Sequence, residues 1–184
     1  VEGAVTMQIE NGTYNENVRI TQIDGTSETN TITFEGKSGN RADVTIAGGG
    51  YSEPAYGSHK EGLFYIDSTS YVTVKNLSIV PCTQTYPSAI HIYNQSRHVT
   101  IDNVYVKADL VTSGYSGMYL VQTESKDEEG KNNDYLTVSN CEFYGGYMAL
   151  RIGGTSYVKL PHEKGAKVIN NIINEPGSKG IYFA

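Results

Sequence analysis

The chain has 184 residues, a length that fits one domain spanning 1–184. Its 14 Lys and Arg residues and 20 Asp and Glu residues give a formal net charge of −6, and because no Lys/Arg-rich run occurs, the sequence argues against nucleic acid as a partner. The 20 Gly and 15 Tyr beside no Trp are typical of a turn-rich β protein, and no apolar run is long enough for membrane insertion.

The first expected strands are short and alternate apolar with polar residues. Strands are predicted at 5–9 and 15–20, on either side of an Asn-Gly turn signal at 11–12. Two more short strands are predicted at 31–34 and 44–46. This opening third of the chain therefore predicts β structure without a helix.

One phrase, apolar-Thr-apolar-x-Asn-apolar, recurs through the rest of the chain. It occurs at 72–77, 99–104 and 136–141, and a weaker copy occurs at 167–172. The Asn residues of the four copies are separated by 27, 37 and 31 positions, which is a spacing typical of stacked repeats.

A second series of expected strands alternates with this phrase. Each begins with Gly or Ala and continues with apolar residues at alternate positions: 62–65, 89–92, 117–120, 149–152 and 180–183. Hairpin signals are sparse, and equivalent strands return only about every 30 residues. The pattern therefore favours a parallel β-helix over an antiparallel sandwich.

In a stacked fold, equivalent positions of neighbouring coils lie next to each other. We expect Asn76, Asn103, Asn140 and Asn171 to form a column at a bend, where an Asn side chain can bond to its neighbour one coil away. A second column of Thr73, Thr100 and Thr137 is expected beside it. Cys141 replaces the apolar residue of the phrase, which predicts a small buried residue, and no disulfide with Cys82 is predicted.

With the opening segment 10–18 and the repeated Val-Thr-Val-x-Asn phrase, the chain resembles right-handed parallel β-helix proteins of the pectate-lyase-like superfamily, especially the repeat proteins of bacterial surfaces. The resemblance implies an all-β, right-handed, single-stranded parallel β-helix of about six coils. It also implies a secreted or cell-surface location. The chain enters and leaves almost within strands, which predicts a truncated stack from a longer secreted protein whose uncapped coils associate end to end.

The catalytic signatures of this superfamily are largely missing. Where pectin methylesterases carry a carboxylate, residues 146–149 offer none, and the paired carboxylates of polygalacturonases do not occur. The Ile-Asp-His phrase of pectate lyases is approached at 99–103, but Asn103 stands in place of His, and the repeat explains Asp102 equally well. A lyase base and cation could still be assembled from Arg151, Lys159 and His162, with calcium as the metal.

A stripe of outward-facing side chains is the predicted binding surface. Aligning the Gly/Ala strands gives the stripe Phe64, His91, Tyr119, Arg151 and Tyr182, which Tyr93 and Tyr147 widen. At about 4.8 Å per strand, five positions span roughly 20 Å, enough for a short oligosaccharide. Aromatic rings stack on sugars, and Arg can pair with a uronate carboxylate. The alternative is that these rings only stabilise the coils.

Two classes of function remain open on the sequence alone. The first is a non-catalytic module that binds a polysaccharide or acts as an adhesin, without a cofactor or metal. The second is a polysaccharide-active enzyme, most plausibly a uronate lyase, and only under this alternative does calcium enter. His59, His98 and His162 lack Cys or His partners at metal-binding spacing, so we interpret them as surface residues.

Overall fold

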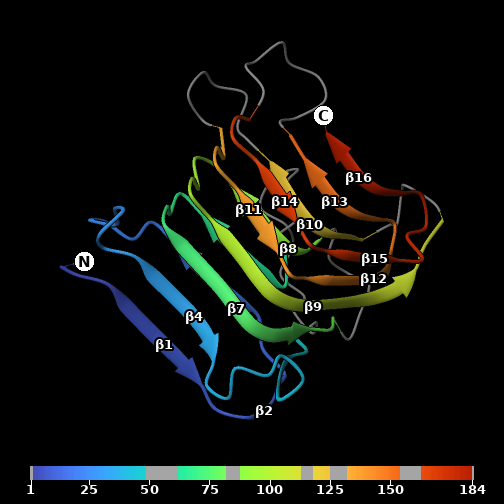
Figure 1. Ribbon diagram of the computed structural model, residues 1–184, viewed down its shortest axis with the longest axis horizontal. Coiled ribbons are helices and arrows are strands. Elements are labelled where there is room, and N and C mark those ends of the chain that lie inside the picture. The colour runs from blue at the N-terminus through green and yellow to red at the C-terminus, as the bar shows by residue number, and fades with distance from the viewer. Residues whose placement is uncertain are drawn as a thin grey trace.

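The computed structural model describes residues 2–48, 62–81, 88–112, 118–124, 132–153 and 163–183. These segments form sixteen strands, and within them no helix is long and apolar enough to cross a membrane. The strands belong to two sheets, which run along the molecule from the N-terminal to the C-terminal coil (Figure 1).

The first sheet has the order β1–β4–β7–β9–β11–β14, to which the short strands β2, β5, β12 and β15 are joined. Its strands are β1 (Val5–Ile9), β2 (Gly12–Tyr14), β4 (Ile32–Gly36), β5 (Val44–Ile46), β7 (Val72–Ile79), β9 (Thr100–Leu110), β11 (Thr137–Ser139), β12 (Glu142–Gly146), β14 (Lys167–Ile169) and β15 (Ile172–Asn174). The second sheet has the order β16–β13–β10–β8–β6–β3. Its strands are β3 (Val18–Thr21), β6 (Phe64–Asp67), β8 (Ser88–Tyr93), β10 (Tyr119–Glu124), β13 (Met148–Ile152) and β16 (Lys179–Phe183).

All strand pairings in these segments are parallel. Thr73 pairs with Thr100, and Thr100 pairs with Thr137, so residues 27 and 37 positions apart become neighbours. Successive turns of the chain therefore stack on one another as a parallel β-helix. This confirms the predicted parallel β-helix and the Thr column, and it excludes the antiparallel sandwich, whereas the expected number of about six coils stays a prediction.

The Asn residues of the repeated phrase occupy sharp bends in the backbone. Asn76, Asn103 and Asn140 have φ values of +58°, +50° and +55°, in the left-handed region that Asn tolerates better than most residues. The side-chain amide of Asn103 donates to Oδ1 of Asn76 across 2.9 Å. The predicted Asn column therefore forms at this corner, where it links successive coils.

The fourth member of the Asn column was predicted wrongly by one residue. Asn170, with φ +54°, donates its side-chain amide to Oδ1 of Asn140 across 2.8 Å and continues the column. Asn171 instead accepts a hydrogen bond from the backbone N–H of Cys141. The weaker copy of the phrase carries two adjacent Asn residues, and its register with β11 decides which one turns the corner.

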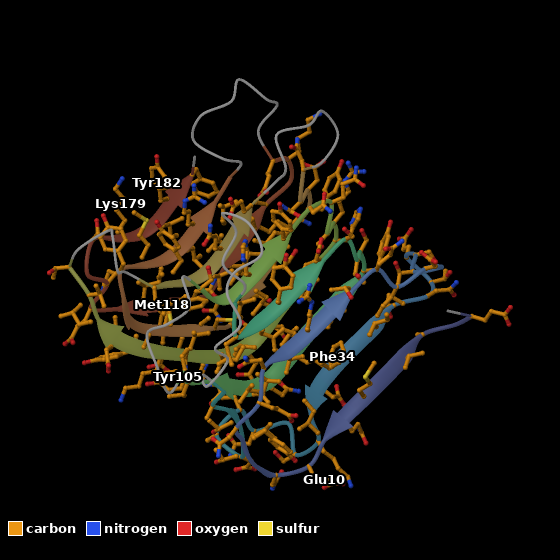
Figure 2. All side chains as sticks on the ribbon, turned by 180° about the vertical axis from the view of Figure 1, so that it is seen from behind. Glu10, Phe34, Tyr105, Met118, Lys179 and Tyr182 are labelled. Atoms are coloured by element: carbon orange, nitrogen blue, oxygen red, sulfur yellow. The ribbon has the colours of Figure 1, made fainter. Side chains whose placement is uncertain are left out.

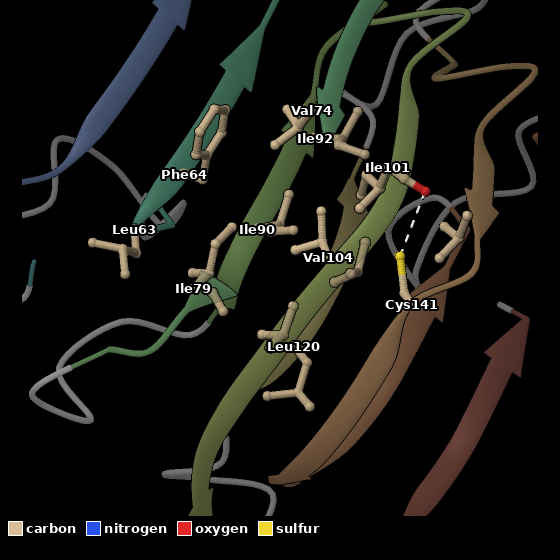
Figure 3. Close-up of a cluster of buried hydrophobic side chains, with 14 of the residues drawn as sticks. Leu63, Phe64, Val74, Ile79, Ile90, Ile92, Ile101, Val104, Leu120 and Cys141 are labelled. Carbon is tan, nitrogen blue, oxygen red and sulfur yellow. Dashed lines mark hydrogen bonds between the residues drawn. The ribbon is translucent and has the colours of Figure 1, made fainter. Parts of the chain in front are cut away.

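The core lies between the two sheets and is built from columns of aliphatic side chains (Figure 3). Phe64, Ile90 and Leu120 are fully buried there, and burying a side chain of this size contributes about 1.5–3 kcal/mol. Cys141 is also buried, with Sγ 3.6 Å from the carbonyl oxygen of Ile101. This confirms the prediction for Cys141, whereas Cys82 lies outside the described residues.

The outermost strands leave some core-directed side chains exposed. Val5 and Met7 on β1 are 40% and 41% exposed, although their neighbours in register, Ile32 and Phe34, pack in or against the core. Phe183 on β16 is 63% exposed, while its neighbour Ile152 is buried. End-to-end association through these strands stays a prediction.

Candidate functional site

The strand register of the second sheet defines one column on its outer face. Tyr65, His91, Gln122, Arg151 and Tyr182 are direct neighbours on β6, β8, β10, β13 and β16. These residues alternate along their strands with core residues such as Phe64 and Ile92. The predicted stripe therefore exists, but two of its members differ from the prediction.

Phe64 and Tyr119 were assigned to the wrong positions in this column. Phe64 pairs with Ile90 and is fully buried, edge-on to Phe34, so Tyr65 is the outer-face residue of β6. Tyr119 pairs with Ser88, and the neighbour of His91 on β10 is Gln122. Because side chains alternate between the two faces of a strand, a one-residue error in alignment exchanges a core residue for a surface residue.

Three aromatic rings in the N-terminal half of this face form a closed cluster. The ring centroid of Tyr65 lies 5.4 Å from that of His91 and 6.2 Å from that of Tyr93. All three side chains are buried; His91 is only 1% exposed. His91 and Tyr93 therefore lie on the outer face of the sheet, as predicted, but they offer little surface to a ligand.

A polar network extends from this cluster. Nε2 of His91 lies 3.4 Å from Oε2 of Glu124, and the Gln122 amide donates to the same oxygen across 3.2 Å. The hydroxyl of Ser88 donates to Oε1 of Gln122 across 2.6 Å. The sequence interpretation did not include Glu124, Gln122 or Ser88, because their contacts arise only from the register of β8 and β10.

The C-terminal half of the same face is accessible and rich in tyrosine and positive charge. We call Tyr119, Tyr147, Arg151, Lys179 and Tyr182 the tyrosine–cation patch. Cζ of Arg151 lies 5.6 Å from the ring centroid of Tyr119, and Nζ of Lys179 lies 4.0 Å from that of Tyr182. Figure 2 shows Lys179 and Tyr182 beside each other on β16.

The side chains of this patch contact one another but remain partly exposed to solvent. Tyr147 contacts Tyr119 edge-on with their centroids 6.2 Å apart, and its backbone N–H donates to the carbonyl oxygen of Met118. Tyr119, Tyr147, Arg151 and Tyr182 are half-buried, and Lys179 is exposed. Four of the seven predicted contact residues thus come together as one accessible surface, to which the structure adds Lys179.

A second group of rings stacks at the corner where the chain passes from the second sheet to the first. The rings of Tyr71 and His98 are 4.5 Å apart and tilted by only 4°, and those of His98 and Tyr135 are 4.6 Å apart and tilted by 15°. We call these three residues the corner stack. Each immediately precedes a copy of the repeated phrase, a sequence signal that the prediction did not use.

The backbone fixes the corner stack from coil to coil. The N–H of Tyr71 donates to the carbonyl of Arg97, that of His98 to Asp134, and that of Tyr135 to Lys164. All three stacked residues have positive φ, between +54° and +63°. His98 is exposed, as predicted, but one of its ring faces is against Tyr71 and the other against Tyr135.

A cavity of about 500 Å³ lies beside the corner stack. Besides the three rings, its lining includes Ser70, Gln95, Arg97 and Asp134, and we call it the corner groove. Nε of Arg97 lies 3.9 Å from Oδ2 of Asp134 and donates to the carbonyl oxygen of Asn132. The groove therefore combines aromatic surface, both signs of charge, a hydroxyl and an amide.

Behind this corner, buried polar side chains link successive coils. The hydroxyl of Ser96 accepts from the N–H of Thr69, and Oδ1 of Asn133 accepts from the N–H of Ser96. The Asn133 amide donates to Oε1 of Glu163 across 3.0 Å, and Thr123 donates to Oε2 across 2.7 Å. Burial raises the pKa of Glu163, although these hydrogen bonds act in the opposite direction. The ladder thus ends on a carboxyl group that is hydrogen-bonded but desolvated.

The described segments contain no group of three or more His, Cys, Asp or Glu side chains that could hold a metal ion. Asp102, the residue that approaches the lyase phrase, accepts hydrogen bonds from Ser139 and Asn140 across 2.7 Å each, so it joins neighbouring coils. Lys159 and His162, proposed for the lyase alternative, lie outside the described residues, as does His59. The prediction that the protein works without a cofactor stays a prediction.

No protein-family model matches the chain, and a comparison with curated proteins gives no match. Among solved structures, the chain is similar to one described as the crystal structure of pectin methylesterase in complex with hexasaccharide VII. The two chains are 14% identical with a TM-score of 0.48, and the alignment covers 92% of this chain. It covers 59% of the other chain, so this chain spans about three fifths of that protein's length. The assignment as a parallel β-helix rests on the strand pairing of the chain itself.

Proposed function

We propose that the chain is a non-catalytic binding module of a secreted or cell-surface protein, and that the tyrosine–cation patch holds an acidic polysaccharide. The observation that carries the proposal is the alternation of rings and cations on neighbouring coils, with Arg151 over Tyr119 and Lys179 over Tyr182. Rings bind the apolar faces of sugars, and guanidinium and ammonium groups pair with carboxylates. A uronate-containing glycan offers both groups at every acidic residue.

The contrast between the two halves of the outer face supports this assignment. Tyr65, His91 and Tyr93 are buried against each other, as side chains that only stabilise the coils would be. The rings of the patch remain accessible, and two cations stand over them although the chain as a whole carries a net charge of −6. Local positive charge on an acidic protein favours an anionic ligand.

The test is calorimetric titration with oligogalacturonate and with a neutral galactan oligomer of the same length. We expect binding of the acidic oligomer only, about tenfold weaker in Arg151→Gln and in Lys179→Gln, and weaker for the wild type in high salt. Lys107→Gln is the matched control, since Lys107 stands over the ring of Tyr144 at 5.5 Å on the other sheet. Equal losses in all three variants, or no preference for the acidic oligomer, would contradict the proposal.

A uronate polysaccharide lyase is the second candidate, and the accessible guanidinium of Arg151 beside the ring of Tyr119 favours it. Arg151 could pair with a uronate carboxyl and so stabilise the charge that develops when the α proton is removed, whereas His91, which lies beside Glu124, is only 1% exposed and too buried to serve as the base. The absorbance of unsaturated uronate ends, followed with and without calcium, separates the two candidates. Product formation that is lost in Arg151→Gln would establish the lyase, whereas binding without product supports the module.

A further inference from the structure

The corner stack places aromatic side chains where the backbone does not require them. At the next corner of each coil, five residues further along the chain, the same left-handed conformation is occupied by Asn76, Asn103, Asn140 and Asn170. In the column of the stack itself, the next coil carries Gly165, also with positive φ. Non-glycine residues other than Asn and Asp adopt this conformation at a cost, so Asn or Gly would turn the chain here more cheaply than Tyr or His.

The rings also remain exposed rather than filling the core. Tyr135 is 48% exposed and His98 is also exposed, although each directly precedes a copy of the repeated phrase, whose apolar residues are buried. Stacking on each other recovers part of the cost of the backbone conformation, but it leaves the ring edges at the surface beside the corner groove. The exposed contact surface is formed by ring edges, because Tyr71 and Tyr135 lie against the two faces of His98 and the ring of Tyr135 also lies against Gly165. Exposed apolar surface of this kind marks a contact site for a ligand with an apolar face.

The charges in the groove limit the class of ligand. Arg97 and Asp134 lie 3.9 Å apart and bring one charge of each sign, so the pair as a whole favours neither an anion nor a cation. The guanidinium of Arg97 donates and the carboxylate of Asp134 accepts, as neighbouring hydroxyl groups of a sugar require, and Gln95 adds an amide. The hydroxyl of Ser70 also lines the groove, but it already donates to the carbonyl of Gln95 and accepts from the N–H of Arg97. The volume of about 500 Å³ lies within the range of small-molecule sites.

We propose that the corner groove is a second carbohydrate site, which binds one neutral pyranose unit through the corner stack, Arg97 and Asp134. The site is separate from the tyrosine–cation patch and does not depend on it, because it lies at the bend after the second sheet and lacks the patch's excess of positive charge. It would take an uncharged sugar, whereas the patch would take an acidic one.

The test is a titration of the ¹⁵N-labelled protein with neutral hexasaccharides of glucose, mannose and galactose at millimolar concentration, followed by amide NMR. We expect at least one of them to shift the amide signals of Gln95, Arg97, His98 and Tyr135, and to leave those of Arg151 and Tyr182 unchanged. In Tyr135→Gly the unfolding transition should be kept, because Gly165 shows that the column accepts glycine, while the affinity falls about tenfold. His98→Asn, which introduces the residue type found at the Asn corner, is the second variant and should give the same loss.

Several results would overturn the proposal. No shift at the corner with any neutral hexasaccharide would do so, as would shifts of equal size in the wild type, Tyr135→Gly and His98→Asn. A titration with oligogalacturonate in the same samples reports on the tyrosine–cation patch through the signals of Arg151 and Tyr182. If oligogalacturonate causes no shift, the function proposed for the tyrosine–cation patch fails. The result for the corner groove is not affected by that failure.

Discussion

Asn103 donates its side-chain amide to Oδ1 of Asn76 across 2.9 Å, although the two residues are 27 positions apart in the chain. Both have positive φ, so each turns its own coil, and the hydrogen bond between them joins the two coils. The same residue type therefore serves two purposes: its backbone tolerates the bend, and its amide joins the coils.

Replacing Asn103 with alanine is expected to destabilise the protein by about 2 kcal/mol, because Ala disfavours the left-handed backbone and removes the bond to Asn76. Asn103→Gly should cost less than Asn103→Ala, since glycine adopts positive φ freely and loses only the side-chain bond. Urea denaturation measures both variants, with the exposed Asn15→Ala as a control that should change the free energy of unfolding by less than about 0.5 kcal/mol. An alanine variant as stable as the glycine variant would contradict this account of the bend.

Cys141 should be inert to thiol reagents in the folded protein. Burial raises its pKa from 9.0 to about 11, which lowers the thiolate fraction near neutral pH by about a hundredfold, and Sγ lies behind the sheet surface. In a Cys82→Ser background, the remaining thiol should react with an aromatic disulfide reagent at a rate set by unfolding. Rapid reaction of that variant under native conditions would show that Cys141 is accessible.

Glu163 should make the protein less stable as the pH rises. Its pKa in the folded state is raised above the ordinary value of 4.5 by burial, so the stabilising contribution of its neutral form is fully present below that value. The contribution is lost as the pH rises from about 4.5 through the raised pKa. In Glu163→Gln the side chain stays neutral, so the variant should gain stability relative to the wild type between pH 4 and pH 7.5, as measured by thermal unfolding at each pH.

The comparison between the two proteins isolates this carboxyl group from the others. Glu35, for example, has a pKa lowered by its hydrogen bond with Lys75, and it contributes with the opposite sign in both proteins. If the difference in stability between wild type and Glu163→Gln is the same at both pH values, Glu163 is not desolvated as described.

Arg41 and Glu142 connect segments about a hundred residues apart, with Nη2 of Arg41 2.7 Å from Oε2 of Glu142. Both side chains are partly exposed, so a double-mutant cycle with Arg41→Gln and Glu142→Gln should give a coupling energy of about 0.5 kcal/mol that falls in high salt. A coupling energy that does not change with salt would contradict an ion pair between these two side chains.

The sequence by itself determined that coils stack and that a column of Asn residues turns one corner of them. The repeated phrase places Thr73, Thr100 and Thr137 at one phase and Val74, Ile101 and Val138 at the next, and the structure keeps both columns. Such columns are readable because each coil makes the same contacts with its neighbour, so one pattern of residues is repeated wherever the contact is repeated. The same pattern identified the Asn corner in three of its four positions.

Only the tertiary structure decided which side chains of the outer face are available. The strands of the second sheet lack a repeated phrase, so their alignment slipped by one residue at Phe64 and by three at Tyr119, and a slip of one residue exchanges the two faces. His91 and Tyr93 are buried, whereas Tyr119, Tyr147, Arg151 and Tyr182 are partly exposed. The sequence pattern had assigned all six to the same outward-facing stripe or its margin. The corner stack likewise depends on coils meeting in three dimensions, because stacking is a contact between residues that the chain keeps 27 and 37 positions apart.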